Sequence, residues 1–437
     1  MKVAFFTLGC KVNRYETQAL CQLAAQRGHE IVGRDADAVI INTCTVTSIS
    51  DHKNIRAFHK LRRENPHAIL AACGCFAQAE PEKIRQTGEI DIICGTHQRA
   101  QVIQLCETAV QRKQNGQSVD DVQNHIAAPA SAFEFLPAGV PMGRTRALLK
   151  IEDGCDNYCA YCIIPYTRGH IRSLPPEKIF EEIERLANAN AHEIVLTGIE
   201  IASYGRDFSP PVLLTDLLYD ILRRYPMIRF RLGSLEPRMI DNYFCETLHG
   251  FANLALHFHL SLQSGSDTVL RRMGRRYSTE QFYQSVILLR EAFPDCSITT
   301  DLIVGFPGET EEEFTETLDF LKRCAFAAVH VFPFSARKGT RAAVAPDQLS
   351  HTEKAERAVR AKEIAGELSQ KYRNRFIGRT LEVLPEHQVN DFWAAHGKYG
   401  FPIYIEPSET IRKNTLVSVS VTGLYKDGVQ AKIKGGI

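Results

Sequence analysis

Three cysteines in one short segment constrain this 437-residue chain more than any other feature. In GCDNYCAYCIIPYTRG they are Cys155, Cys159 and Cys162, and the segment directly follows an apolar run at 147–151 that is expected to form a strand. Three thiols cannot all pair with one another as disulfides, and a closed tetrahedral zinc site needs four ligands. Three thiolates suit a four-iron cluster that keeps one iron open to another ligand. The alternatives are buried structural cysteines, or a zinc site with a distant fourth ligand.

The chain after position 141 predicts a partial barrel of the (β/α)6 type. Its strand candidates are 147–151, 193–197, 229–233, 256–262, 298–304 and 328–334. Most of these runs are followed by a helical stretch, which is typical of parallel strands with helices outside and an active site at the carboxyl ends of the strands. The three-cysteine segment follows the first strand, on a loop where such a barrel places its chemistry.

Residues 1–113 predict a separate α/β domain with a parallel sheet. Its strand candidates are 3–7, 38–42, 69–72 and 90–94, with a helix expected at 15–28 between the first two. Cysteines follow three of these strands, namely Cys10, Cys44 and the neighbouring Cys73 and Cys75. Because the carboxyl ends of parallel strands meet at one edge of a sheet, three thiols can converge there as a second ligand set.

The other cysteines are expected to pack as small apolar residues. This interpretation covers Cys21, Cys106, Cys245, Cys296 and Cys324, whereas Cys94 ends a strand and stays a weaker candidate ligand. Thirteen cysteines in a chain without a cleavable leader predict a reducing compartment and hence the cytoplasm. The apolar runs are too short to span a membrane, so no membrane association is expected.

Two changes of pattern divide the rest of the chain. A polar and then Ala- and Pro-rich stretch at 114–140 predicts a linker, so the barrel domain is expected at 141–371. A capping box of Ser350 and Glu353 begins a long helix over 350–376. Alternation with period two then predicts a small antiparallel β-barrel within 372–437.

The segment CDNYCAYC resembles the signature of the radical S-adenosylmethionine (radical SAM) superfamily, with the aromatic Tyr161 before the last cysteine. The resemblance implies that the open iron binds the amino and carboxylate groups of SAM, and that one electron cleaves the sulfonium to a 5′-deoxyadenosyl radical. It also implies cofactor contacts at the strand ends. These candidates are Gly198 and Glu200 in LTGIEIASYG, Glu236 in RLGSLEP, and Gln263 and Arg271 in LSLQSGSDTVLRRMGR.

The N-terminal motifs TLGCKVNRYET, INTCTVT and GCFAQ resemble the methylthiotransferase branch of that superfamily. This resemblance implies a second four-iron, four-sulfur cluster on Cys10, Cys44 and Cys75, with Cys73 as the alternative third ligand. It further implies that one SAM methylates sulfur held at this cluster, that a second SAM supplies the radical, and that the methylthio group is delivered to a substrate carbon.

Within this branch, TLGCKVNRYET is most similar to the group that acts on C2 of N6-threonylcarbamoyladenosine at position 37 of tRNA. Relatives that act on N6-isopentenyladenosine usually have GCQMN there. The implied partners are the anticodon stem-loop of tRNA and an electron donor such as flavodoxin or ferredoxin. The alternatives are N6-isopentenyladenosine, a ribosomal-protein aspartate, or a non-catalytic iron–sulfur protein that binds RNA.

Basic residues supply candidates for substrate recognition. Arg168 and Arg271 can pair with the carboxylate of a threonylcarbamoyl group, and their alternative role is pairing with barrel carboxylates. The segment LRRMGRRY at 270–277 is a local basic surface or a solvated helix face. The C-terminal unit resembles a TRAM domain, in which lysines would meet phosphates unless they only protect a strand edge. The candidates there are Lys413, Lys426, Lys432 and Lys434, with Tyr404 or Tyr425 for stacking.

Overall fold

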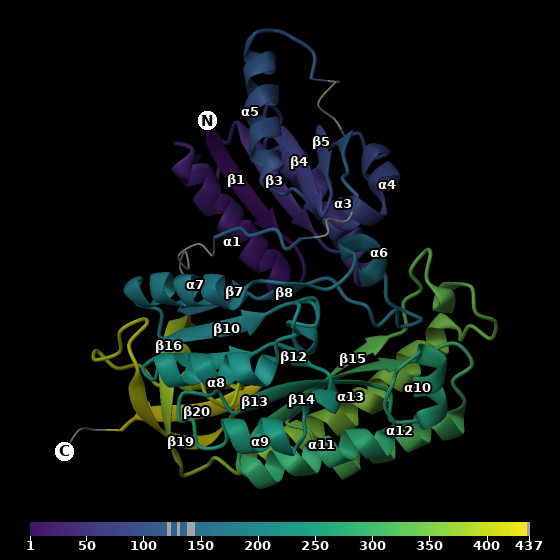
Figure 1. The fold of residues 1–437 in the computed structure, drawn as a ribbon, viewed down its shortest axis with the longest axis vertical. Helices are drawn as coiled ribbons and strands as arrows, with labels where there is room; N and C mark the ends of the chain where they lie inside the picture. Colours follow the sequence, from purple (N-terminus) through teal and green to yellow (C-terminus); the bar gives the residue numbers. More distant parts are fainter. Residues whose placement is uncertain (120–123, 129–131, 138–144, 435–437) are drawn as a thin grey trace.

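The computed structural model describes residues 1–119, 124–128, 132–137 and 145–434. An N-terminal α/β domain stands above a barrel of parallel strands, and a small C-terminal barrel lies below it (Figure 1). The expected linker at 114–140 and the expected start of the barrel at 141 fall partly outside the described residues. Within that stretch the chain adds an edge strand, β6, to the N-terminal sheet.

The N-terminal sheet confirms the four predicted strands and adds two short edge strands. Its order is β2-β1-β3-β4-β5-β6, and each neighbouring pair is parallel. The strands are β1 (Lys2–Thr7), β2 (Glu30–Ile31), β3 (Ala38–Thr43), β4 (Ile69–Gly74), β5 (Ile92–Cys94) and β6 (Asn124–His125). The helices are α1 (Lys11–Gln26), α2 (Ser48–Glu64), α3 (Cys75–Ala79), α4 (Pro81–Arg85) and α5 (Gln101–Gln114). Apolar side chains of α1 and α5 cover one face of the sheet, and those of α2, α3 and α4 cover the other.

The six predicted barrel strands are all present and parallel to their neighbours. They are β7 (Arg146–Lys150), β10 (Glu193–Thr197), β11 (Arg229–Leu232), β13 (His257–Gln263), β14 (Ser297–Val304) and β15 (Ala328–Pro333). The third strand is interrupted at Gly233, so β11 pairs with β10 while its continuation β12 (Ser234–Leu235) pairs with β13. This break lets the strands curve as an open arc without losing their pairing.

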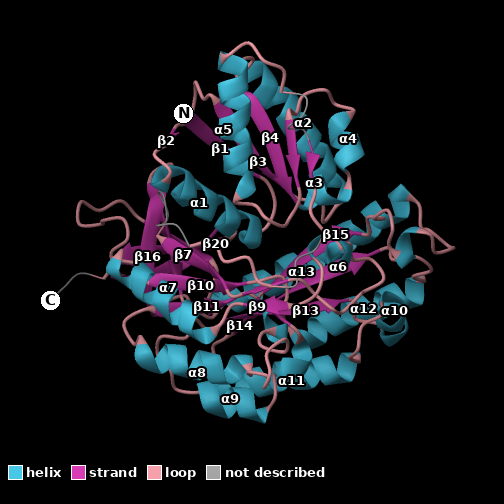
Figure 2. Ribbon diagram, turned by 45° about the horizontal axis from the view of Figure 1, so that its top comes forward, coloured by secondary structure: helices cyan, strands magenta, loops and turns pink. Residues whose placement is uncertain are grey.

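Helices cover the outer face of the arc (Figure 2). They are α7 (Pro176–Asn188), α8 (Leu214–Arg224), α9 (Asn242–Leu248), α10 (Asp267–Met273), α11 (Thr279–Ala292) and α12 (Glu311–Cys324). The short α6 (Ile164–Arg168) instead contacts α3 of the N-terminal domain. Short 3-10 turns lie at Ile201–Ser203, Pro237–Met239 and Arg341–Ala343. The pair β8 (Glu152–Asp153) and β9 (Arg172–Ser173) is antiparallel and brackets the three-cysteine loop.

The long helix and the C-terminal barrel are also confirmed. Helix α13 (His351–Asn374) begins with the predicted capping box of Ser350 and Glu353. The strands β16 (Thr380–Val389), β17 (Phe392–Gly397), β18 (Pro402–Ile405), β19 (Val417–Tyr425) and β20 (Gly428–Ile433) close as β16-β17-β18-β20-β19. The pairs are antiparallel, as predicted, apart from the pair β18–β20, which is parallel.

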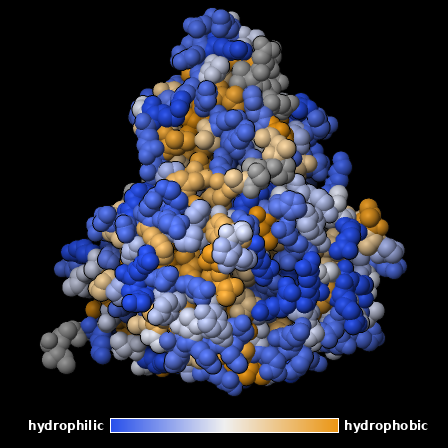
Figure 3. Space-filling view, in the orientation of Figure 1, coloured by the Kyte–Doolittle hydropathy of each residue, from blue (hydrophilic) through white to orange (hydrophobic). Residues whose placement is uncertain are grey.

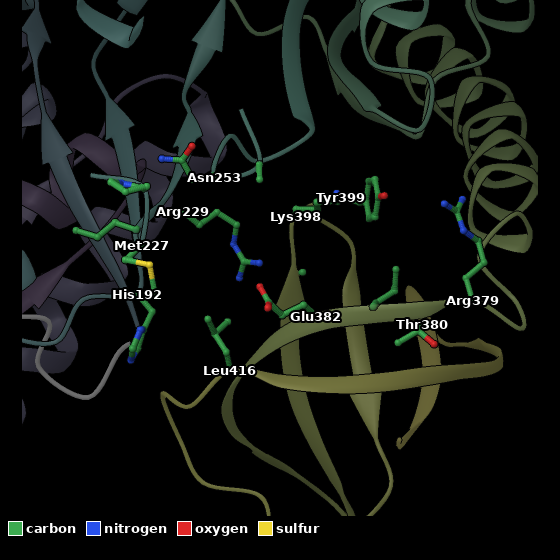
Figure 4. A pocket seen from close by; sticks show the side chains of 15 residues that line it. His192, Met227, Arg229, Asn253, Arg379, Thr380, Glu382, Lys398, Tyr399 and Leu416 are labelled. Atoms are coloured by element: carbon green, nitrogen blue, oxygen red, sulfur yellow. The ribbon is translucent and has the colours of Figure 1, made fainter. Parts of the chain in front are cut away.

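The two smaller parts contact opposite ends of the parallel strands. At the amino ends, Arg231 Nη2 donates to the Gly397 carbonyl at 2.8 Å, and Ser297 Oγ donates to the Tyr399 carbonyl at 2.6 Å. A cavity of about 580 Å³ lies at this junction, with Arg229 and Glu382 projecting into it (Figure 4). The N-terminal domain contacts the carboxyl ends, where Figure 3 shows apolar residues gathered at the waist of the molecule. No described helix has the length and apolarity to cross a bilayer.

Candidate active site

The three-cysteine loop is held by its own backbone at the carboxyl end of the first barrel strand. Gly154 begins the loop with a φ of +87°, and an added Cβ would lie 1.9 Å from the His170 carbonyl oxygen. The amide of Cys155 donates to the Gly169 carbonyl at 3.1 Å, and that of Cys162 donates to the Cys159 carbonyl at 3.0 Å. A glycine is therefore required for the entry into the loop, and the backbone bonds fix the thiols as one set.

A cation that the sequence did not single out lies against this thiol set. Arg275 Nη1 donates to Cys159 Sγ at 3.3 Å, and its Nε donates to the Tyr277 hydroxyl at 3.0 Å. Burial raises the pKa of the Cys162 thiol to about 12, and the neighbouring Cys159 adds to that rise while Arg275 opposes it. Arg275 thus favours thiolates at a site whose burial disfavours them, as metal ligation requires.

Arg275 belongs to the basic segment 270–277, for which the sequence alone predicted only a local basic surface or a solvated helix face. The predicted contact Arg271 is exposed on α10, away from this set. Gly274, in the left-handed conformation, ends α10 and turns the chain so that Arg275 points back toward the loop. Arg275 is therefore a better candidate than Arg271 for a contact at the cofactor site.

Tyr161 packs beside the loop thiols. It lies against the small apolar cluster that contains Ala160 and Met273. Burial raises the pKa of its hydroxyl well above the usual range, and Cys159 adds to the rise. The aromatic ring therefore forms one wall of the thiol site.

The end of the second barrel strand offers a buried acceptor without a donor. Glu200 is 7% exposed, and its Oε1 has no hydrogen-bond partner among the described residues. Burial raises the pKa of this carboxyl to about 7, with Glu236 adding and Arg275 opposing. At Gly198 an added Cβ would lie 2.6 Å from Glu152 Oε2, so this position has no room for a side chain. An orphaned carboxylate above a side-chain-free cradle suits the amino group of SAM.

The two other predicted contacts, Glu236 and Gln263, lie at the ends of the third and fourth strands, and Glu236 is already paired. Glu236 is buried at the end of the third strand, and Arg238 binds its carboxylate with Nη2–oxygen distances of 2.8 Å. Gln263 has a φ of +71° at an irregularity in the β13–β14 register, which turns it at the end of the fourth strand. Both residues lie at the carboxyl ends of their strands, as the barrel pattern predicts.

The N-terminal thiols Cys10, Cys44 and Cys75 converge at the matching edge of the upper sheet. Cys10 caps α1, Cys44 follows β3 and Cys75 begins α3. A Cβ on Gly9 would lie 2.7 Å from Cys44 Sγ. Burial raises the pKa of Cys44 to about 12, and the nearby thiols of Cys75 and Cys10 add to the rise.

Cys73 does not join this set. It is fully buried in the apolar core with Cys94 and Cys106. Burial raises its pKa, and the first neighbouring charge that adds to the rise is Cys94. Since β4 ends at Gly74, Cys73 and Cys75 are directed to different surroundings. The geometry thus favours Cys75 over Cys73 as the third ligand of the N-terminal set. Cys94, the weaker candidate, lies in the apolar core.

Arg168 joins the barrel to Cys75 and to α1 instead of lying open to a substrate. Its Nε donates to Cys75 Sγ at 3.3 Å, and its Nη1 donates to Glu16 at 2.8 Å and to Asp153 at 2.9 Å. Its Nη2 donates to Asn13 at 3.1 Å and to Glu16 at 3.2 Å. The side chain is 0% exposed and each guanidinium N–H is used, so the alternative of structural pairing holds for Arg168.

The surrounding charges form a buried network between the domains. Glu16 on α1 also pairs with Arg99 at 3.1 Å and with Lys150 on β7 at 3.2 Å. These three cations hold the pKa of Glu16 at about 2 although burial opposes them. Arg168, six residues after Cys162, binds Cys75 Sγ at 3.3 Å, so Cys75 lies at the side of the interface where the three-cysteine loop ends.

Comparisons with known proteins agree with this architecture. Residues 149–321 match the model of the radical SAM superfamily, and residues 2–95 match the model of uncharacterized protein family UPF0004. The chain is 40% identical to "Threonylcarbamoyladenosine tRNA methylthiotransferase MtaB" of Bacillus subtilis (strain 168), over 89% of this chain and 86% of that protein. It is 35% identical to the protein of the same name in Aquifex aeolicus, over 88% of this chain and 92% of that protein.

A second kind of relative is as similar as the Aquifex aeolicus protein. The "tRNA-2-methylthio-N(6)-dimethylallyladenosine synthase" of Bacillus licheniformis is 35% identical, over 87% of this chain and 75% of that protein. Among solved structures, the radical SAM methyltransferase TsrM from Kitasatospora setae superposes with a TM-score of 0.57 at 14% identity, over 78% of this chain and 74% of that one. This last likeness concerns the fold alone.

The chain belongs to the radical SAM methylthiotransferases. It is therefore a transferase whose cofactors include SAM and a four-iron, four-sulfur cluster, and the relatives named above are tRNA-modifying members of the family.

Proposed function

We propose that this enzyme methylthiolates C2 of N6-threonylcarbamoyladenosine at position 37 of tRNA. The proposal is supported by the convergence of the N-terminal thiols at the interface with the barrel, where Arg168, which follows the three-cysteine loop, binds Cys75 Sγ at 3.3 Å. Its support for this nucleoside is the 40% identity, over 89% of the chain, to a relative named for it.

The two sets of cysteines would hold different clusters. Cys155, Cys159 and Cys162 would hold the radical-generating cluster, and Cys10, Cys44 and Cys75 would hold an auxiliary one. When bound, the first cluster would supply the electron that cleaves SAM to methionine and a 5′-deoxyadenosyl radical, which takes the C2 hydrogen. The second would supply a methylated sulfur that leaves iron to join the carbon radical, with one electron returning to that cluster. An unactivated C2–H is a poor acid, so a general base would remove its hydrogen slowly.

The chain's own residues position the reactants. Glu200 and the cradle at Gly198 would orient the amino group of SAM, and Glu236 and Gln263 would complete the rim at the next two strand ends. Arg275 would keep the cluster thiols deprotonated. The buried network around Arg168 would fix the spacing of the two open irons, on which the approach of the substrate carbon depends.

The C-terminal barrel is proposed to bind the tRNA. Lys426 Nζ lies 5.8 Å from the ring centre of Tyr404 and 5.1 Å from that of Tyr425, which contact each other edge to face. A lysine over two half-buried rings forms a combined cationic and aromatic surface suited to RNA. An external donor such as flavodoxin or ferredoxin would supply the electrons.

Two single substitutions test the third auxiliary ligand. Cys75→Ala should lower the iron content of the anaerobically reconstituted protein by about half, because a cluster with two remaining thiolates is not retained. Cys73→Ala, the matched control two residues away, should keep the wild-type iron content. The reverse pattern would make Cys73 the ligand.

The nucleoside itself is tested in cells. The tRNA nucleosides of cells that lack this chain and of cells that re-express it should differ in 2-methylthio-N6-threonylcarbamoyladenosine by mass spectrometry. Restoration of the 2-methylthio-dimethylallyl nucleoside instead would assign the enzyme to the second kind of relative. No change in either nucleoside would favour a protein substrate or a non-catalytic role.

A further inference from the structure

A basic cavity next to Cys10 has no role in the chemistry described above. Its volume is about 320 Å³, and its lining includes Lys11 and Arg14 from α1, Arg146 from β7 and Arg231 from β11. Glu386 is the carboxylate in its lining. Lys11 directly follows Cys10, so the cavity begins beside the proposed auxiliary ligands.

The arginines contributed by the barrel strands are already paired. Arg231 Nε lies 2.7 Å from Glu193 Oε1, and Arg146 Nε lies 2.7 Å from Glu386 Oε1. By contrast, the side chains of Lys11 and Arg14 have no hydrogen bond or ion pair in the part of the chain that the structure describes. Both residues are exposed to solvent in addition to lining the cavity. The cavity thus holds uncompensated positive charge.

A metal ion fits this environment less well than an anion does. His259, Asp301 and His330 offer ligand atoms within 4.8 Å of one another. However, Lys11 is close enough to His330 to help lower the pKa of that imidazole. The field that would attract a carboxylate would repel a divalent cation. The electrostatics therefore select a negatively charged group.

Of the two substituents carried by the relatives' substrates, only one is an anion. A threonylcarbamoyl group ends in a carboxylate, whereas a dimethylallyl group is wholly apolar. An apolar group seated against Lys11 would take water from the ammonium without replacing its hydrogen bonds, which is costly, while a carboxylate would replace them. The cavity that begins beside Cys10 is therefore suited to the first substituent.

We propose that Lys11, assisted by Arg14, binds the carboxylate of the threonylcarbamoyl group and selects the substrate. This inference rests on the proposed function. Arg146 pairs with Glu386, and Arg231 pairs with Glu193, which Arg229 shares, so these two arginines serve as the wall of the subsite.

The test compares anticodon stem-loop RNAs that differ in one group. They carry N6-threonylcarbamoyladenosine as the free acid, the same nucleoside as its methyl ester, or N6-dimethylallyladenosine. The wild-type enzyme should prefer the acid to the ester by about 10- to 100-fold in kcat/KM, the range expected for a hydrogen bond to a charged group. Lys11→Gln should lower kcat/KM for the acid until the two RNAs react alike.

Two further variants show whether such a loss is specific. Lys11→Arg keeps the charge and should restore part of the preference, which a purely structural role for Lys11 would not predict. Lys53→Gln, at an exposed lysine on α2, should keep the full preference. Iron content equal to that of the wild type would show that each variant is folded.

The possible failures are distinguishable. If the wild-type enzyme acts on the acid and Lys11→Gln still prefers it over the ester, the subsite is wrong and the proposed function stands. If the wild-type enzyme acts only on the dimethylallyl RNA, the proposed function and the subsite both fall.

Discussion

Replacing Cys155, Cys159 and Cys162 together by alanine should abolish 5′-deoxyadenosine formation while the protein keeps about half of its iron. The three thiols lie on one loop whose backbone is fixed at Gly169 and Met273, so they act as one set. Without them no iron is positioned beside Glu200 to bind and reduce SAM. The N-terminal thiols lie on separate loops of another sheet and should retain their own cluster.

A second triple variant serves as the matched control. Cys245, Cys296 and Cys324 are also barrel cysteines, and each is buried in apolar packing away from the loop. Their replacement by alanine should leave iron content and SAM cleavage at the wild-type level. Both variants are compared by iron analysis and by chromatography of reactions reduced with dithionite. Undiminished cleavage in the first variant would overturn the assignment of the radical-generating cluster.

Arg168→Met should lower the free energy of unfolding by about 3–5 kcal/mol, the cost typical of removing one partner from a buried ion pair. The substitution leaves Glu16 and Asp153 buried with less positive charge around them. It also removes the contact between Cys75 and the barrel, so the N-terminal domain should separate from the barrel at lower denaturant concentration.

The comparison for this variant is Arg63→Met, at an exposed arginine on α2. Denaturant titration, monitored by circular dichroism, should detect a large decrease in the free energy of unfolding for Arg168→Met and almost none for Arg63→Met. Adding Glu16→Gln to Arg168→Met should recover part of the loss, since it removes one unpaired charge. Equal, small losses in both single variants would mean that the network does not hold the domains together.

The sequence predicted the elements whose signals are local. The barrel strands are short segments rich in apolar residues, and the capping box at Ser350 is a four-residue pattern, so both were predicted correctly. Strand β17, with the sequence FWAAHG, was missed because its side chains do not alternate between apolar and polar. Its place in the sheet comes from pairing with β16 and β18.

The sequence could not predict which candidate side chains meet. Arg168 was a candidate for binding substrate, but its partner Glu16 is 152 residues away in the chain. Cys73 and Cys75 would share one face of a continuous strand, and only the turn at Gly74, with a φ of +94°, separates them. The Lys-Val pair at positions 11 and 12 was a marker of substrate group, and the fold adds a physical reason by placing Lys11 in the basic cavity.

The central claim is that the chain holds two four-iron clusters, one on each set of three cysteines, and Mössbauer spectroscopy with iron quantitation on the anaerobically reconstituted wild-type protein tests it most directly. The account predicts about eight irons per chain, in two four-iron clusters. Half that iron in a single cluster, or zinc at either set of cysteines, would contradict it.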